Sequence, residues 1–357
     1  MSLPHRLATL VALPLLLMAA PGLHAAVLCA DTGLELRDAL QAASQNGSDN
    51  EIRVTVGVKH YQQEGTSAVW SYSTGDARDL TLSGGWGPGC ASQSQDPRLT
   101  RLSGGTFGTT LAFLTHSSSS AAITVRNLTL EYGRGRQYLE GAGLDVQASQ
   151  FATPLVLVEQ VVVRYNDEVE GAVDGAAVAV RVVQSASGIY TLRNLLVEDN
   201  LTRGLWLSLK PNAVAYLNNS TFVGNNTAVA NVDTVAVEGS GGTVWIANNL
   251  MHDNGGSTDL DLESGPVTFL RNNHLQVLSG SPGSNLGMSS GDPMLTQGPD
   301  GWRRPRRESP LCDTGHAAPA GGSGGLDLGG GPRVLARVDR GALESDCDTL
   351  FRAGFQS

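Results

Sequence analysis

The chain has 357 residues, with 24 Lys and Arg against 34 Asp and Glu, which gives a formal net charge of −10 at pH 7. This negative balance argues against duplex nucleic acid or an anionic membrane surface as a partner. The length is enough for a large core, in either one elongated domain or two compact ones.

Residues 1–26 have the features of a signal peptide. Arg6 supplies a positive start, LATLVALPLLLMAA is apolar over the length of a signal h-region, and PGLHAA offers small residues for cleavage. The apolar run is too short for a membrane span, and no second one follows it. We expect an exported protein, cleaved near Ala25 or Ala26 and without a membrane span after cleavage, in the extracellular space, at the cell surface or in the periplasm.

Residues 27–104 are expected to form an N-terminal cap and the first coils of a repeated structure. The stretch GLELRDALQAAS at residues 33–44 places leucine and alanine at helical spacing and predicts one helix of about three turns. EIRVTVGV then alternates apolar and polar residues, as a strand does. Because the end of a repeat array is an unpaired edge, we expect the helix to cap the first coil.

Residues 105–290 contain a repeat. VRNLTLEYG begins at Val125, and VEQVVVRYN, LRNLLVEDN, LNNSTFVGN and IANNLMHDN follow at intervals of roughly 24 to 34 residues, with LRNNHLQVL as a weaker copy. In each strong copy a first polar residue precedes a second turn residue by six positions. The first residues are Asn127, Gln160, Asn194, Asn219 and Asn248. The second residues are Gly133, Asn166, Asn200, Asn225 and Asn254.

The repeat predicts a parallel β-helix. Its units lack the two helices of a helical solenoid and are shorter than a propeller blade, whereas one coil of short strands fits their length. Stacked asparagines can hydrogen-bond along the stack and tolerate left-handed backbone angles at the turns. The predicted turn ladder consists of Asn166, Asn200, Asn225 and Asn254. The apolar residues between the turns are expected to fill the core: Val161, Val163, Leu195, Val197 and Leu250.

Two acidic clusters are candidate calcium or sugar sites. The first lies in YNDEVEGAVDG, with Arg164 and Arg181 on either side, and the second in STDLDLESG. Each can equally be a solvated loop or the solvent face of one coil, and we favour this simpler interpretation for both. The acidic residues are Asp167, Glu168, Glu170 and Asp174 in the first cluster and Asp259, Asp261 and Glu263 in the second.

Catalytic signatures are weak. No NTD, paired DD or GHG pattern of a polygalacturonase and no GxSxG elbow stands out, and His252 and His316 each stand alone. Surface aromatic residues could stack on sugar rings. The candidates in strand-like stretches are Trp70, Tyr72, Trp206 and Trp245.

Four cysteines follow the signal segment, an even number that suggests two disulfides in an oxidising compartment. Four cysteines allow three connectivities. Two lie near each end of the chain, which favours Cys29–Cys90 and Cys312–Cys347. No CxxC pattern or Cys/His cluster indicates a zinc site.

The chain resembles an exported bacterial family of right-handed parallel β-helix repeat proteins. Besides the repeats, LTLSGGWGPGCASQSQDPRLTRLSG is similar to the segment that precedes the first coils in that family. SPLCDTG, DLGGGPR and VDRGALE, within residues 291–357, resemble the C-terminal module called the choice-of-anchor Q domain. Cys312 stands where that family usually has an apolar residue, which supports its pairing with Cys347. The matched positions are Ser309, Pro310, Asp313, Gly315, Asp327, Pro332, Arg333, Asp339, Gly341 and Glu344.

Four charged residues of this module are expected to fix its shape. An arginine can fork two carboxylates, and such pairs hold loop geometry. We therefore expect a structural clasp rather than a catalytic site, formed by Asp313, Arg333, Asp339 and Glu344.

Together these features predict an all-β, right-handed parallel β-helix with a short N-terminal capping helix and an irregular C-terminal cap. The predicted function is non-catalytic: an exported, surface-associated protein that binds a glycan, mediates adhesion or serves as a scaffold, without a cofactor. The alternative is a polysaccharide lyase or glycoside hydrolase acting on an acidic polysaccharide, with Arg164 or Arg181 facing the carboxylates of the Asp167–Asp174 loop and calcium bound. A self-associating adhesin is a third alternative, marked by an uncapped end coil.

Overall fold

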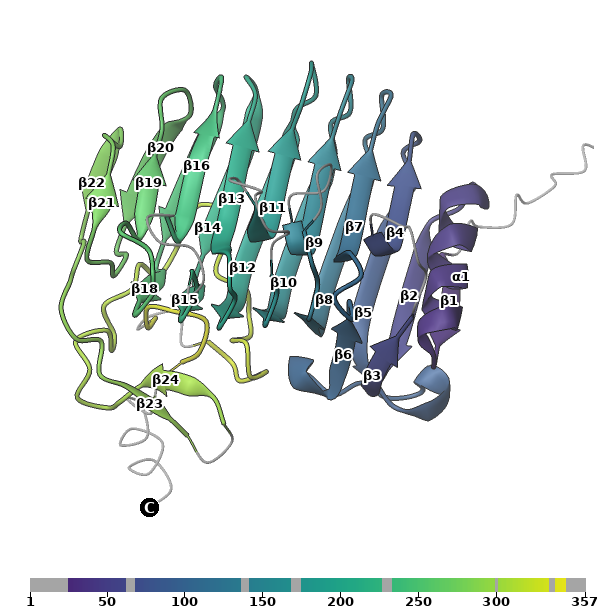
Figure 1. Cartoon of the computed structure of the whole chain (residues 1–357), viewed down its shortest axis with the longest axis horizontal. Helices are drawn as coiled ribbons and strands as arrows, with labels where there is room; N and C mark the ends of the chain where they lie inside the picture. The colour runs from purple at the N-terminus through teal and green to yellow at the C-terminus, as the bar shows by residue number, and fades with distance from the viewer. Residues whose placement is uncertain are drawn as a thin grey trace, which may run out of the picture.

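The computed structural model describes residues 25–61, 68–135, 141–167, 175–226, 233–298, 301–333 and 338–344. These residues form a parallel β-helix, in which each coil adds one strand to each of two long parallel sheets (Figure 1). The predicted all-β parallel β-helix is confirmed. No described helix is both long and apolar enough to cross a membrane.

The first sheet runs the length of the molecule. Its main path is β1 (Ala26–Ala30), β2 (Asn50–Thr55), β5 (Leu80–Trp86), β8 (Ala122–Glu131), β10 (Leu155–Arg164), β12 (Gly188–Glu198), β14 (Ala213–Asn218), β17 (Thr243–Ala247), β20 (Val267–Arg271) and β22 (Ser284–Leu286). Short strands continue it beyond a turn within the coils: β3 (Gly57–His60), β6 (Thr100–Ser103), β15 (Thr221–Val223) and β18 (Leu250–His252).

The second sheet closes the coils on the opposite side. Its order is β21 (Leu278–Ser279), β19 (Leu260–Leu262), β16 (Val235–Gly239), β13 (Arg203–Leu209), β11 (Ala176–Val182), β9 (Gly141–Ala148), β7 (Thr109–Thr115) and β4 (Ala68–Thr74). A separate antiparallel hairpin consists of β23 (Leu295–Gln297) and β24 (Arg303–Pro305). Two short 3₁₀ helices, η1 (Pro88–Cys90) and η2 (Pro97–Leu99), follow β5.

The predicted helix is α1 (Gly33–Gln45), which packs at the first coils (Figure 1). Thr32 caps it, because its hydroxyl accepts from the Glu35 amide while the Glu35 carboxylate accepts from the Thr32 amide. Leu36 and Leu40 are fully buried in the same core as the inner strand residues. The helix therefore covers apolar surface that the first coil would otherwise expose.

The core predictions hold with one exception. Val161, Val163, Leu195 and Val197 belong to the continuous core between the sheets. Leu250 is buried but is not part of that core; it lies near Gly341 of the C-terminal region, and the next residue, Met251, points inward instead.

The first polar residue of each repeat bends the backbone. Gln160, Asn194 and Asn248 have φ angles of 53°, 55° and 60°, and the other repeats have Asn127, Asn219 and Asn272 in the same left-handed region. Asparagine tolerates this conformation better than most residues. Each coil therefore turns at the same place, and the polar side chains line up along one edge.

Residues 314–327, which we call the flank segment, run along that edge. The side chain of Asn272 donates to the carbonyl of Thr314 at 2.7 Å, that of Asn248 to His316 at 2.9 Å and that of Gln160 to Asp327 at 3.0 Å. The segment thus passes back over the coils in the direction opposite to their stacking. The sequence predicts an irregular C-terminal cap, and the described residues of this segment lie along the side of the coils.

The C-terminal region also makes a second apolar core on the outside of the β-helix. Val162, Leu196 and Val223 point away from the inner core and pack with residues of the C-terminal region. Those residues are Trp302, Leu328, Ala342, Leu343 and Leu295. The Arg98 guanidinium lies 4.1 Å from the centre of the Trp302 ring and joins this layer to the η2 region.

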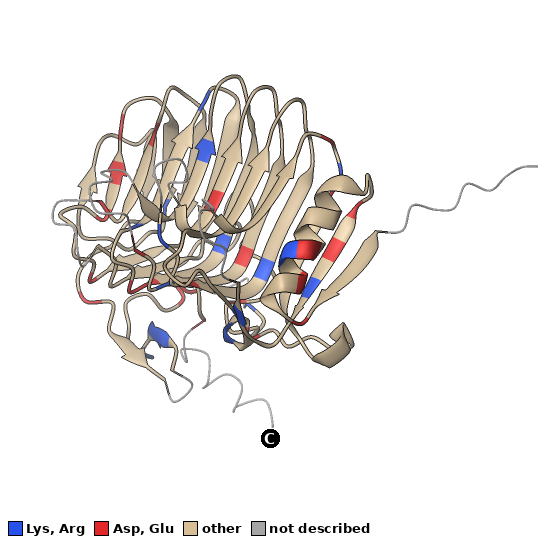
Figure 2. Cartoon of the chain, turned by 45° about the vertical axis from the view of Figure 1, so that its right-hand side comes forward, with Lys and Arg blue, Asp and Glu red and all other residues tan. Residues whose placement is uncertain are grey.

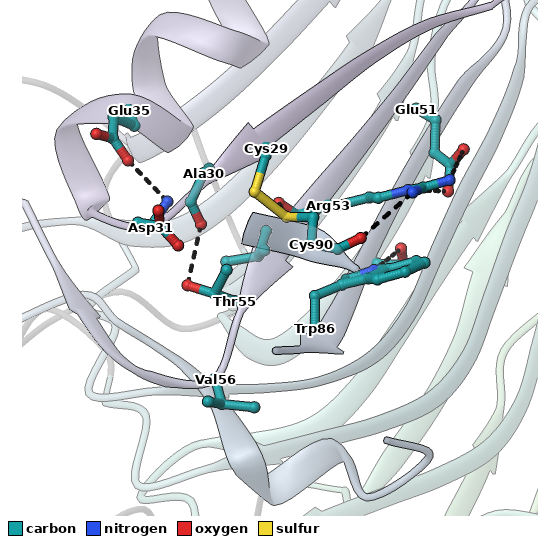
Figure 3. Close-up of a disulfide and its surroundings, with 12 residues drawn as sticks. Cys29, Ala30, Asp31, Glu35, Glu51, Arg53, Thr55, Val56, Trp86 and Cys90 are labelled. Atoms are coloured by element: carbon teal, nitrogen blue, oxygen red, sulfur yellow. Dashed lines mark hydrogen bonds and ion pairs between the residues drawn. A yellow bond between two sulfur atoms is a disulfide. The ribbon is translucent and has the colours of Figure 1, made fainter. Parts of the chain in front are cut away.

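The Cys29–Cys90 disulfide is confirmed, with 5.9 Å between the Cα atoms, and it ties β1 to η1. Figure 3 shows it beside Arg53, whose guanidinium lies 4.2 Å from the centre of the Trp86 ring and pairs with Glu51 at 2.8 Å. The other predicted pairing, Cys312–Cys347, involves Cys347, which lies outside the described residues.

Candidate functional site

The outer face of the first sheet carries three rows of side chains, which the parallel register repeats from β8 to β20. We call this surface the outer face. The first row is Ala122, Leu155, Ile189, Val214, Thr243 and Val267. The second row is Thr124, Leu157, Thr191, Tyr216, Trp245 and Phe269. The third row is Arg126, Glu159, Arg193, Asn218, Ala247 and Arg271.

The second row ends in three aromatic residues on successive coils. Trp245 and Phe269 stack with 4.2 Å between ring centres and 20° between ring planes, and Trp245 is 37% exposed. Tyr216 is the register partner of Trp245 on β14. The flank segment lies against Tyr216 at Gly321, where a Cβ atom would be only 2.5 Å from the tyrosine Cγ. Trp245 and Phe269 therefore form the open part of this aromatic row.

The neighbouring rows give this surface an apolar side and a polar side. In the first row Leu155 is 51% and Val267 is 50% exposed. In the third row the Arg193 guanidinium pairs with Glu159 on the adjacent coil at 2.7 Å, and Arg271 is exposed. Figure 2 shows bands of both charge signs on neighbouring strands. In the third row the sign alternates over the first three positions, and the next two, Asn218 and Ala247, are uncharged. Such a face can offer ring stacking, apolar contact and hydrogen bonds to one extended ligand.

Sequence analysis singled out Trp245 but missed Tyr216 and Phe269. A signal was present, because each aromatic residue lies three positions before the left-handed asparagine of its repeat. Aligning the copies on that asparagine would have placed the three rings in one column. The other aromatic candidates are buried: Trp70, Tyr72 and Trp206.

The first acidic cluster is described only at Asp167, since Glu168, Glu170 and Asp174 lie outside the described residues. Asp167 forms a backbone bridge with Arg134 of the preceding coil.

The flanking arginines of this cluster lie on different sheets. Arg164 on β10 contacts Glu131 at 3.2 Å, and Arg181 on β11 contacts Asp145 at 3.1 Å. Both carboxylates are fully buried and belong to neighbouring strands rather than to the loop. Each arginine thus pairs with a carboxylate of a neighbouring strand, while three of the four acidic residues of the loop lie outside the described residues.

In the second acidic cluster the carboxylates have separate roles. Asp259 accepts hydrogen bonds from the amides of Gln276 at 2.7 Å and Val277 at 3.1 Å, which holds a turn of the next coil. Asp261 lies on β19, and Glu263 is exposed. Across the described ranges, no group of three or more His, Cys, Asp and Glu side chains is placed to hold a metal ion.

The four predicted clasp residues lie close together. Arg333 is buried and pairs with Glu344 at 2.6 Å, and Asp339 accepts from the Asp313 amide at 2.7 Å and donates its own amide to Glu344 at 3.4 Å. Burial raises the pKa of Glu344 to about 7, while the Arg333 charge acts in the opposite direction.

Arg333 also reaches the β-helix. Its guanidinium donates to Oδ1 of Asn194 at 2.7 Å and to the carbonyl of Ala342 at 2.9 Å. Since Asn194 belongs to the row of left-handed turn residues, this arginine joins the C-terminal region to the coils.

The comparisons with known proteins add a single likeness. No family model and no curated protein matches the chain. Among solved structures, the A-module of the mannuronan C-5 epimerase AlgE4 from Azotobacter vinelandii is similar, with 11% sequence identity and a TM-score of 0.31 over 71% of this chain and 75% of that chain. An identity and a TM-score this low give no information on shared activity. The resemblance to the choice-of-anchor Q domain stays a prediction.

Proposed function

We propose that the protein is an exported, non-catalytic binding protein that holds a polysaccharide chain along its outer face. The observation that carries this proposal is the stacked pair Trp245 and Phe269, which is open to solvent on a regular sheet surface. The disulfide between Cys29 and Cys90 supports export, because such bonds persist in oxidising compartments.

Trp245 and Phe269 lie on the outer face of the sheet and are not part of the inner apolar core, so core packing does not explain their position. Exposed apolar side chains that gather on one surface mark an interaction site more often than scattered ones do. Here Trp245 and Phe269 lie in register on neighbouring strands, and exposed Val267 lies in the neighbouring row on the same strand as Phe269. Sugar rings present C–H faces to aromatic rings and hydroxyl groups to charged side chains, so a glycan matches both sides of this surface.

Direct binding measurements test the proposal. Mature protein is passed over immobilised neutral and acidic polysaccharides, and affinity is followed by Trp fluorescence. Trp245→Ala is expected to weaken binding about tenfold, and Trp245→Phe to retain most of it. Tyr165→Ala is the matched control, because Tyr165 is also an exposed ring in a stacked pair, with Tyr132 at 5.6 Å, but lies at a different turn. Equal binding by wild type and Trp245→Ala would refute the outer face as the binding surface.

The lyase or hydrolase alternative is tested in the same incubations. Calcium is supplied or chelated while unsaturated products and reducing ends are measured over time. Product that depends on calcium and disappears in the Asp167→Ala/Asp174→Ala variant would make this protein an enzyme. Binding without product supports the proposed function.

A further inference from the structure

A cavity of about 300 Å³ lies between the β-helix and the β23–β24 hairpin. Val223 and His252 line it from β15 and β18, and Leu295 and Arg303 line it from the hairpin. The flank segment binds the turn edge between this cavity and the outer face, so the cavity is a second, separate feature. Its volume is at the lower end of the range for small-molecule pockets.

The walls of the cavity are held in place. Val223 belongs to the second apolar core, and Leu295 packs against that core. The Arg303 guanidinium contacts Asp199 at 3.3 Å, which fixes the position of its charge. Asp292 accepts from the Met294 amide at 2.7 Å, so its carboxylate is also oriented. A cavity with such fixed walls is largely preformed for a ligand.

The His252 ring forms part of one wall. Nδ1 of His252 is buried and has no hydrogen-bond partner among the described residues. The neighbouring His274 ring, 6.4 Å away between ring centres, has partners for both nitrogens, the Ser289 hydroxyl at 2.9 Å and the Gly291 carbonyl at 3.1 Å. Because this nitrogen is shielded from solvent, only the remaining, partly exposed atoms of the His252 side chain can contact a ligand in the cavity.

The charges of the lining select the class of ligand. Asp253 and Asp292 outnumber the single guanidinium of Arg303, and Arg303 already faces Asp199. An anion would be repelled. The two carboxylates can accept hydrogen bonds from the hydroxyl groups of a ligand, and the Arg303 guanidinium and the Gln297 amide can donate hydrogen bonds to those hydroxyl groups. Val223 and Leu295 offer apolar contact.

We propose that this cavity binds one uncharged, polyhydroxylated sugar unit, either a free monosaccharide or the end residue of a neutral glycan. The site is independent of the polysaccharide surface proposed above, because none of its lining residues belongs to the three rows of the outer face.

The test uses the mature chain with ¹⁵N-labelled histidine and D-glucose, D-galactose, D-mannose and D-glucuronate as probes. At least one neutral hexose is expected to show saturation transfer and to shift the His252 ring signals, and D-glucuronate to bind more weakly. Neutral disaccharides distinguish a free monosaccharide from the end of a glycan as the ligand. If the site accepts a glycan end, disaccharides shift the same His252 signals, and if it accepts only a free monosaccharide, they do not. The absence of any His252 shift with the neutral hexoses at tens of millimolar would refute the site.

Variants tie the binding to the cavity. His252→Ala is expected to lower hexose affinity about tenfold, and His60→Ala, an exposed histidine on β3, to leave it unchanged. If His252→Ala lowers the melting temperature, the hexose affinity of Gln297→Ala is decisive. Gln297 lines the cavity but is exposed, so its replacement should not affect folding. Unchanged affinity in Gln297→Ala and in a folded His252→Ala would overturn the proposal. Trp245→Ala should affect only polysaccharide binding, so the two proposals can fail separately.

Discussion

The side-chain amide of Asn200 donates a hydrogen bond to Oδ1 of Asn225 on the next coil at 2.8 Å. Asn166 donates in the same way to Asn200 at 2.9 Å, and Asn225 to Asn254 at 3.1 Å. The amide of Asn200 also donates to the carbonyl of Val163 at 3.0 Å. Asn166, Asn200 and Asn225 thus each join their own coil to both neighbours, and the stability of the coils is coupled through buried polar groups.

Replacing Asn200 by alanine should therefore destabilise the stack. The change removes the buried hydrogen bonds that the Asn200 side chain makes with the backbone amide of Asn166, the carbonyl of Val163 and Oδ1 of Asn225. We expect a loss of about 3 kcal/mol in the free energy of unfolding, measured by denaturant titration. The control is Asn285→Ala on β22, where the side chain is exposed. A loss no larger than in the control would show that the ladder adds nothing to stability.

Much of this fold was predictable because the ladder asparagines recur in the sequence at the same position of each repeat. Polar residues six positions apart, with β-branched residues and leucines between them, predicted the coils. The helical spacing at residues 33–44 predicted α1, which spans Gly33–Gln45. Which side chains of a strand point into the inner core was harder to predict, because both faces of the strand carry apolar residues in LRNNHLQVL and LRNLLVEDN. Leu195 faces the inner core, whereas Leu196 faces the second core, and alternation alone cannot distinguish them.

The candidate sites were less accessible from sequence. The flank segment is rich in glycine and alanine and has no period, so its position follows only from partners such as Asn194 and Asn248, far away in sequence. The cavity beside His252 depends on the β23–β24 hairpin packing there. A lone histidine in the sequence does not reveal that it will line a cavity together with Arg303.

Removing the disulfide by Cys29→Ser/Cys90→Ser should destabilise the N-terminal end. The bond closes a loop with a sequence separation of 61 residues, and the chain-entropy model gives about 4 kcal/mol for a loop of this size. Because coils contact mainly their neighbours, we expect faster hydrogen exchange in β1 and β2 and little change in β17 and β20. The measurement is hydrogen exchange with mass spectrometry on both forms. A uniform change along the stack would contradict this local effect.

Gly321→Ala should loosen the flank segment. Gly321 has a φ of 81°, and a Cβ atom there would lie 2.5 Å from Cγ of Tyr216. The left-handed backbone costs about 1–2 kcal/mol for alanine, and the overlap with the ring adds to that cost. We expect a lower melting temperature and increased exposure of Tyr216 to fluorescence quenchers. Gly325→Ala is the matched control, because a Cβ atom at Gly325 meets nothing within 4 Å. Equal effects of the two changes would mean that the segment does not depend on this close contact.

Acidification should weaken the last coils through His274. Burial lowers the pKa of His274 from its ordinary 6.5, with smaller contributions in the same direction from His252 and Arg340, while the Gly291 carbonyl and Asp259 oppose the change. Between the two pKa values the unfolded chain binds more protons than the folded one. The stability that His274 contributes is therefore present above pH 6.5 and is lost as the pH falls through the folded pKa.

The corresponding measurement compares melting temperatures at pH 7 and pH 5 for wild type and His274→Gln, which removes the titrating ring and retains a polar side chain. His60→Gln is the control, since His60 is exposed. Wild type and the control should lose more stability on acidification than His274→Gln does. Hydrogen exchange should place the loss near β18, where Leu250 forms a backbone bridge with His274, and near β20, the strand that precedes His274 in the chain. An identical pH dependence in all three proteins would show that His274 does not set the acid limit of the stack.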